Sequence, residues 1–213
     1  MNMRVERKKY LDHRIDISCI ILSNLNDLFV KERIIPSIIR NSKSHSIEII
    51  VSDNSPTQNF KCDNVNIIHT EPYHIPKAYN KGVSEAKGKY IALFHDDCEI
   101  KDDKWIDKLT SELNDEVYAV SPEKYHNLET TFLKEVPLMM ERKNFLEIGG
   151  YDETYYFGYE DVDISDRILK KGKKIKEVKI GYNHYGGMSS ILMYCDKDLE
   201  NHYKKIFFIK LIY

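Results

Sequence analysis

The chain has 213 residues, of which 42% are apolar and 31% are charged, and its formal net charge at pH 7 is -2. This length suits one domain, and the apolar share can fill a sizeable core. The near balance of charge leaves no broad basic surface to attract a phosphate backbone, so we expect no nucleic acid partner.

The four cysteines, Cys19, Cys62, Cys98 and Cys195, lie far apart and form no C-x-x-C pair. This spacing argues against a zinc knuckle and a disulfide scaffold, and it favours a reducing, cytoplasmic setting. Residues 1–14 are polar, unlike a signal peptide, and no apolar run approaches the ~20 residues of a spanning helix. We therefore expect a soluble protein with at most peripheral membrane contact.

The first half of the chain alternates short apolar runs with helix-like segments. The apolar runs are rich in isoleucine and predict strands buried on both faces: residues 16–23, 46–53, 65–70 and 89–95. A helix is predicted over residues 27–41, where Pro36 should kink or restart it. A second helix is predicted over residues 75–88, with Pro76 in its first turn and Gly88 as its stop.

The second half continues this alternation. Helices are predicted over residues 103–113, 142–150 and 160–172, and strands over residues 117–122 and 173–182. Because parallel neighbours need crossover connections, the order predicts an α/β domain with a Rossmann-like, mostly parallel central sheet flanked by helices. The apolar residues 201–213 would dock on the core, lie on a membrane surface, or lead into further domains.

Acidic side chains follow two predicted strands at the point where each strand ends. The stretch KYIALFHDDCEI runs into His95, Asp96 and Asp97, and Asp53 follows the second strand. Ligands of open parallel sheets bind beyond the carboxyl ends of the strands. There Asp53 could accept a hydrogen bond from a base or ribose, and an acid of the fourth strand could hold a divalent ion. The alternative is that Asp53 and Asp96 only begin turns, since DNSP is good turn chemistry.

A third acidic cluster opens the helix predicted over residues 160–172. Asp161 falls on the same face as the isoleucines of this helix, so its carboxylate needs a charged or protonatable partner opposite. Asp163 and Arg167, four residues apart, are expected to form an ordinary ion pair. The alternative for Glu160 and Asp161 is that they only favour the helix dipole.

His184 follows the last predicted strand and precedes two glycines, in the sequence GYNHYGGMSS. A lone histidine is more often structural than a ligand, and the glycines allow either a turn or close approach to a bound group. Beside an acidic site, imidazole is a common metal ligand. His184 is therefore a candidate ligand.

Five segments together resemble family 2 glycosyltransferases of the GT-A fold, in order and over residues 16–190. The segments are ISCIILSNLND, IEIIVSDNSP, IPKAYNKGVSEAKGKYIALFHDD, GGYDETYYFGYEDVDISDRILKKG and NHYGG. In that family the helix before the fourth strand reads A-x-x-x-N-x-G and then A-x-G. Most of this pattern is matched here by Ala78, Asn80, Gly82, Ala86 and Gly88. Each piece is weak alone, but the combination is specific.

The resemblance implies a donor site for a nucleoside-diphosphate sugar of the UDP or dTDP type. It assigns donor contacts to Ser23, Asp53, Asn80, Asp96 and Asp97. The D-x-D element of the family falls on His95, Asp96 and Asp97, a departure in which an imidazole replaces the first acid. The implied metal ligands are Asp97 and His184, and the implied ion is Mn²⁺ or Mg²⁺.

The resemblance also implies the chemistry. Asp161, preceded by Glu160 in the ED pair, maps to the catalytic base of an inverting transfer to a hydroxyl of a glycan or glycolipid. The aromatic faces of Tyr155, Tyr156 and Tyr159 could hold the acceptor sugar or could pack the loop. The Q-x-x-R-W element of processive synthases is absent, which implies transfer of a single sugar. The resemblance further implies a hexosyl or deoxyhexosyl group and a place in polysaccharide biosynthesis.

We expect one domain over residues 1–213, with a donor-binding half (1–110), an acceptor-binding and catalytic half (111–195) and a C-terminal extension (196–213). Two other classes remain open. One is a nucleotide-sugar-binding module or inactive homologue, in which His95 weakens metal binding. The other is a sugar nucleotidyltransferase, which usually needs a glycine- and arginine-rich loop after the first strand, where this chain has SNLNDLF.

Overall fold

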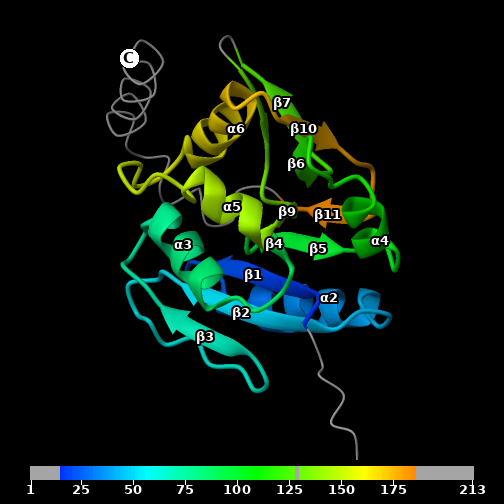
Figure 1. The fold of residues 1–213 in the computed structure, drawn as a ribbon. Coiled ribbons are helices and arrows are strands. Elements are labelled where there is room, and N and C mark those ends of the chain that lie inside the picture. Colours follow the sequence, from blue (N-terminus) through cyan, green and yellow to red (C-terminus); the bar gives the residue numbers. More distant parts are fainter. Residues whose placement is uncertain (1–14, 128–129, 186–213) are drawn as a thin grey trace, which may run out of the picture.

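The computed structural model describes residues 15–127 and 130–185, in which strands and helices alternate as predicted (Figure 1). The strands are β1 (Ile17–Ser23), β2 (Ile47–Asp53), β3 (Asn66–His69), β4 (Tyr90–Phe94), β5 (Cys98–Ile100), β6 (Val117–Ser121), β7 (Lys124–His126), β8 (Thr131–Leu133), β9 (Leu138–Glu141), β10 (Lys174–Glu177) and β11 (Tyr182–His184). The helices are α1 (Asp27–Phe29), the π-helical η1 (Val30–Ile34), α2 (Ile35–Asn41), α3 (Ile75–Glu85), α4 (Trp105–Thr110), α5 (Arg142–Ile148) and α6 (Glu160–Lys170).

A seven-stranded sheet forms the centre of the molecule, in the order β10-β6-β9-β4-β1-β2-β3. All of its strands run in the same direction except β9, which is antiparallel to both of its neighbours. The mostly parallel sheet was predicted, whereas β9 was not. Its sequence, LMME, is short and lacks the β-branched and aromatic residues that favour strands.

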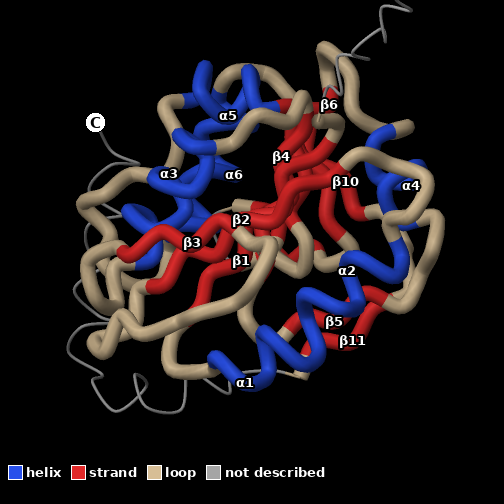
Figure 2. Tube along the Cα trace, turned by 90° about the horizontal axis from the view of Figure 1, so that it is seen from below, coloured by secondary structure: helices blue, strands red, loops and turns tan. Residues whose placement is uncertain are grey.

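Helices cover both faces of this sheet (Figure 2). Side chains of α3, α5 and α6 pack on one face, and side chains of η1, α2 and α4 pack on the other. Strand β1 serves both cores, because Ile20 and Leu22 belong to the first, whereas Cys19 and Ile21 belong to the second. This is why apolar residues face both sides of the strand.

The helix predicted over residues 27–41 forms and changes its geometry where Pro36 was expected to interrupt it. A π-helical turn, Val30–Ile34, precedes α2, and Pro36 lies in the first turn of α2. Proline has no N–H to donate to the preceding turn, so the regular α-helical ladder cannot run through it.

Two glycines of the family-like pattern let α3 and the turn after it lie close to the sheet. A Cβ on Gly82 would approach Cγ2 of Ile20 to 2.6 Å, and one on Gly88 would approach the backbone nitrogen of Ser18 to 2.6 Å. Gly88 was predicted to stop the helix, but α3 ends earlier, and Ala86 already has an extended backbone. Gly88 is therefore a close-packing residue.

Two strand predictions need correction. Strand β3 was predicted to be buried on both faces, but Asn66 and His69 are exposed because β3 is the edge strand of the sheet. The strand predicted over residues 173–182 is shorter, because β10 ends at Glu177, and a separate strand that was not predicted, β11, begins at Tyr182 in a different sheet. Strand β11 pairs with β5, and β7 pairs with β8, both antiparallel. Strands β5, β7 and β8 were not predicted, since three residues are too few to show a period.

Among residues 15–127 and 130–185, none of the helices has the length and apolar character needed to cross a membrane. Cys19, Cys62 and Cys98 are free thiols. Cys195, the glycines after His184 and the predicted C-terminal extension lie outside the described residues.

Candidate functional site

The carboxyl ends of β1, β2 and β4 bring predicted donor residues to one edge of the sheet. Ser23 and Asp53 are register partners at the ends of β1 and β2. The backbone N–H of Asn24 donates to Oδ2 of Asp96 at 3.1 Å, which joins the loop after β1 to the loop after β4. The side-chain hydroxyl of Ser23 is buried and has no hydrogen-bond partner among the described residues.

The Asp53 carboxylate is fully buried, and both of its oxygens have polar partners. Its Oδ1 accepts hydrogen bonds from the N–H and the hydroxyl of Ser55, at 3.0 and 2.6 Å. Its Oδ2 lies 3.1 Å from Nδ1 of His69 and accepts from the Phe60 N–H at 3.4 Å. These contacts hold the turn after β2, as the DNSP sequence allows, and a contact of Asp53 with the donor stays a prediction.

Three side chains that can bind a metal converge beyond β4. One ligand atom each of His95, Asp97 and His184 lies within 4.8 Å of the others. Nε2 of His184 lies 3.5 Å from Oδ1 of Asp97. The β5–β11 pairing creates this contact, because His184 is the register partner of Cys98, the residue after Asp97.

This cluster fits a divalent ion. Two atoms that bind one ion through bonds of about 2.1 Å lie roughly 3 Å apart at neighbouring positions and at most about 4.2 Å apart at opposite ones, so the 3.5 Å between His184 and Asp97 suits a shared ion. A carboxylate oxygen beside imidazole nitrogens is a donor set that Mn²⁺ accepts. Within the described ranges it is the one group of three or more such residues. Asp97 and His184 were predicted as ligands, whereas His95 was not.

Glu123 contacts His184 through the ring nitrogen that does not face Asp97. Oε1 of Glu123 lies 3.0 Å from Nδ1 of His184, and the hydroxyls of Tyr125 and Tyr182 each donate to Glu123 at 2.8 Å. Burial favours the protonated acid, but the hydrogen bonds with His184 and the tyrosines outweigh it and lower the pKa of Glu123 to about 2. Sequence reasoning missed Glu123, although it also follows the end of a predicted strand.

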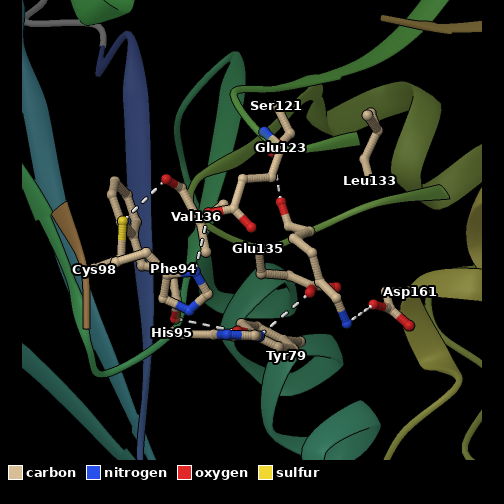
Figure 3. A network of polar contacts seen from close by, with 12 residues as sticks. Tyr79, Phe94, His95, Cys98, Ser121, Glu123, Leu133, Glu135, Val136 and Asp161 are labelled. Carbon is tan, nitrogen blue, oxygen red and sulfur yellow. Dashed lines mark hydrogen bonds and ion pairs between the residues drawn. The ribbon is translucent and has the colours of Figure 1, made fainter. Parts of the chain in front are cut away.

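His95 forms a second histidine–carboxylate pair (Figure 3). Its Nε2 lies 3.3 Å from Oε2 of Glu135, a fully buried acid that also accepts a hydrogen bond from the Tyr151 hydroxyl. Burial alone would lower the pKa of His95, but the hydrogen bond and the negative charge of Glu135 raise it to about 9. Glu135 was not predicted, because it and Lys134 are the only charged residues in the apolar run FLKEVPLMM.

Asp161 has the charged partner that its buried position was predicted to need. The Lys134 ammonium donates to Oδ2 of Asp161 (Figure 3), and Oδ1 accepts from the Val162 N–H at 2.8 Å. The Asp161 side chain is 3% exposed and that of Lys134 is 34% exposed. Burial would lower the pKa of Lys134, but the charges of Asp161 and Glu135 raise it above its usual range.

Glu160, next to Asp161, has a different environment. Its side chain is buried, and Oε2 has no hydrogen-bond partner among the described residues. Burial, followed by the negative charge of Asp161, raises the pKa of Glu160 to about 8. Glu160 is therefore mostly neutral at pH 7.

The predicted ion pair of Asp163 and Arg167 is present, with Arg167 Nε donating to Asp163 at 2.8 Å. It is more than a surface pair, because Asp163 is buried and Arg167 also donates to the carbonyls of Ile148 and Gly150 at 2.8 Å each. The pair therefore joins α6 to the end of α5.

Asn80 holds the loop between α5 and α6. Its Nδ2 donates to the Tyr151 carbonyl at 2.8 Å and to Glu153 at 3.0 Å, and its Oδ1 accepts from the Tyr151 N–H at 2.9 Å. The oxygen and the nitrogen of the Asn80 amide thus both form hydrogen bonds within the fold. The structure does not bring Asn80 into the cluster around Asp97.

The three tyrosines proposed for the acceptor occupy different environments. Tyr155 is fully buried and packs against Val162, so it fills the loop instead of presenting a face. The Tyr156 hydroxyl donates to the Pro72 carbonyl at 2.6 Å. Tyr159 precedes α6 with a left-handed backbone, φ 68°, and is only partly buried.

Solved structures have the same fold although their sequences have diverged. A mannosyltransferase from Pyrobaculum calidifontis, in complex with GDP-Man and Mn²⁺, is 14% identical over 77% of this chain and 55% of its own length, with a TM-score of 0.58. The catalytic domain of Drosophila β1,4-galactosyltransferase 7, in complex with xylobiose, is 16% identical over 86% of this chain and 74% of its own, with a TM-score of 0.58. A mutant of that galactosyltransferase, in complex with manganese, UDP-Gal and xylobiose, is 16% identical over 80% of this chain and 71% of its own, with a TM-score of 0.54.

At these identities the likeness establishes the fold, which is GT-A. This chain spans only 55% of the length of the mannosyltransferase. No curated protein sequence matches the chain. The sequence profile of glycosyl transferase family 2 matches residues 20–166, a span that includes both acidic strand ends and the first turns of α6. The chain therefore belongs to glycosyl transferase family 2.

Proposed function

We propose that the protein is an inverting, metal-dependent glycosyltransferase that moves one sugar from a nucleoside-diphosphate sugar to a hydroxyl of a glycan or glycolipid. The observation that carries this proposal is the 3.5 Å contact between Asp97 and His184 at the carboxyl edge of the sheet. Ligands of open α/β sheets bind at that edge, and the two side chains supply oxygen and nitrogen ligands for one ion.

The donor class is supported by the related folds. The mannosyltransferase was solved with GDP-Man and Mn²⁺, and the galactosyltransferase mutant with UDP-Gal and manganese. We assign this chain a UDP- or dTDP-type donor of a hexosyl or deoxyhexosyl group, and Mn²⁺ or Mg²⁺ as the ion. The buried Ser23 hydroxyl, which has no partner among the described residues, is available to the nucleoside. Asp96 accepts a hydrogen bond from the N–H of Asn24, the residue after Ser23.

Asp97 and His184 would hold the ion. When bound, a divalent ion neutralises the charge that develops on the leaving diphosphate. In this proposal Asp161 takes the proton of the acceptor hydroxyl, an effect typically worth ~10²- to 10⁴-fold in rate. The Lys134 ammonium contacts the Asp161 carboxylate, and the raised pKa of Glu160 avoids a second negative charge beside it. A single displacement of this kind inverts the anomeric carbon.

Tyr159 and Tyr156 are the candidates for contact with the acceptor, since Tyr155 is buried. We place the protein in the cytoplasm, in polysaccharide biosynthesis, as a non-processive enzyme. Its donor-binding half is residues 1–110 and its catalytic half is residues 111–195.

Donor hydrolysis tests the proposal. A panel of UDP- and dTDP-sugars is incubated with the protein, with and without Mn²⁺, and release of the nucleoside diphosphate is measured. Metal-dependent release from one donor is the expected result. Binding without release, even with acceptors present, would indicate a nucleotide-sugar-binding module. Synthesis of a sugar nucleotide from a triphosphate would indicate a nucleotidyltransferase.

A further inference from the structure

Two histidine–carboxylate pairs meet at the metal cluster, and both carboxylates come from the segment between β6 and β9. Glu123 contacts His184 at 3.0 Å, and Glu135 contacts His95 at 3.3 Å (Figure 3 shows Glu123, Glu135 and His95). The two imidazole rings face the same region, with their centroids 6.1 Å apart. One segment therefore supports both imidazoles.

The arrangement at His184 is that of a supported metal ligand. Nδ1 faces Glu123, and Nε2 faces Asp97. A carboxylate on one ring nitrogen fixes the ring orientation and the tautomer, so the other nitrogen presents its lone pair to the ion. Glu123 is itself held by the hydroxyls of Tyr125 and Tyr182, which leave the carboxylate little freedom to turn.

His95 has the same kind of support. Its Nε2 contacts Glu135, and the Glu135 carbonyl also accepts from the His95 backbone N–H at 2.8 Å. Glu135 is fully buried and accepts from the Tyr151 hydroxyl, so it too is fixed. The His95 side chain keeps 26% of its surface exposed. In a neutral imidazole a contact through one ring nitrogen leaves the other for a ligand, so an ion bound to His95 would displace the proton that Glu135 favours.

We propose that His95 is a third protein ligand of the ion, which completes a set of two imidazoles and one carboxylate, with Glu123 and Glu135 as positioning residues. The proposal rests on the proposed function only in using the same metal site. It assigns a role to the residue that departs from the D-x-D element. Asp97 supplies the one carboxylate of the set, and a nitrogen of His95 replaces the oxygen that the first acid of the element would give.

This set has a consequence for metal selectivity. Imidazole ligands favour first-row transition ions, whereas Mg²⁺ prefers oxygen ligands and water. The site should therefore bind Mn²⁺ and Co²⁺ more tightly than Mg²⁺. A purely structural His95, paired with Glu135 alone, would leave one nitrogen ligand and a smaller difference.

The test is a count of imidazole nitrogens on bound Mn²⁺. Mn²⁺ alone is added to the full chain, and pulsed electron paramagnetic resonance with ¹⁴N- and ¹⁵N-histidine labelling reports the coupled nitrogens. Two coupled imidazoles are expected in the wild type, and one in His95→Asn. Since the wild-type count needs no substitution, the test does not depend on whether a variant folds. One imidazole in the wild type, or no binding of Mn²⁺ at millimolar concentration, would overturn the proposal.

The positioning residues are tested by affinity. Glu123→Gln should weaken Mn²⁺ binding by about 10- to 100-fold while both nitrogens remain coupled. The matched control is His45→Ala, which removes a histidine that pairs with Asp107 at 3.0 Å outside the cluster, and it should leave Mn²⁺ affinity unchanged. Equal affinity of Glu123→Gln and wild type would remove Glu123 from the proposal.

The nitrogen count and the donor assay separate the two claims. One imidazole together with metal-dependent donor hydrolysis would overturn this inference and leave the proposed function standing. Two imidazoles on bound Mn²⁺, without binding or hydrolysis of any nucleotide sugar, would support this inference and overturn the proposed function.

Discussion

The ammonium of Lys134 contacts the carboxylate of Asp161, and this ion pair joins the residue after β8 to the first turn of α6. The contact gives a carboxylate that is only 3% exposed a cationic partner, which a buried acidic group needs. It also places a cation beside the group that we assign as the base. The pair therefore has consequences for both activity and stability.

Replacement of Asp161 by Asn should reduce transfer to the acceptor by about 10²- to 10⁴-fold, because the amide cannot take the hydroxyl proton. Donor affinity, measured by calorimetry with Mn²⁺ present, should change little, since Asp161 does not belong to the metal cluster. The matched control on the same helix is Asp166→Asn, which removes a carboxylate that pairs with Lys170 and should retain activity. Unchanged turnover in Asp161→Asn would exclude the base role.

Replacement of Lys134 by Met should lower the free energy of unfolding by about 2 kcal/mol, because it leaves the buried Asp161 carboxylate without its cation. The value is below that for a fully buried pair, since Lys134 is one-third exposed. Urea unfolding at 25 °C measures it. Lys171→Met, which removes the exposed pair with Glu147, should cost much less, because water screens that pair. Equal losses in the two variants would argue against a buried pair.

Glu160 should make stability depend on pH. Its pKa is about 8 in the folded protein, against an ordinary value of 4.5 in the unfolded chain, so the folded state binds more protons between these values. The unfolding free energy contributed by Glu160 is thus fully present below about pH 4.5 and is lost as pH rises through 8, with a slope of at most about 1.4 kcal/mol per pH unit. Wild type should therefore lose stability relative to Glu160→Gln between pH 5 and pH 8. Parallel stability curves for the two proteins would contradict this.

Replacement of Gly88 by Ala should destabilise the fold by about 1 to 3 kcal/mol, because the new Cβ would meet backbone atoms of Ser18 and Tyr90 at 2.6 and 2.8 Å. The matched control is Gly181→Ala, whose Cβ would lie no closer than 3.4 Å to any neighbour. Thermal unfolding should show a clear shift for the first variant and a small one for the second. Similar shifts would mean that the strand can move away from the turn.

Much of the fold follows from the sequence because buried parallel strands are continuous apolar runs. Strands β1, β2 and β4 were predicted within one residue at each end, since isoleucine-rich runs on both sides of a helix leave few alternatives. Strand β9 and the short pairs β5–β11 and β7–β8 escaped prediction. Their lengths of three or four residues carry no period, and long-range pairing decides their formation.

The candidate site was predictable where a residue sits at a strand end and not where its partner is distant in sequence. Asp97 and His184 were identified in this way, and their contact depends on pairing between residues more than eighty positions apart. Glu135 and Lys134 gave no signal, because a single charged pair within an apolar run has no pattern that shows which buried group it faces. Their roles follow only from the three-dimensional contacts with His95 and Asp161.

The most direct test of the central claim is a calorimetric titration of nucleoside diphosphates and their sugars, with and without Mn²⁺. We expect one nucleotide to bind, and to bind only when Mn²⁺ is present. The Asp97→Asn variant should lose this Mn²⁺-dependent binding, whereas Asp166→Asn should bind the nucleotide as the wild type does. A folded protein that binds none of these nucleotides with Mn²⁺ present would contradict a working donor site around Asp97 and His184.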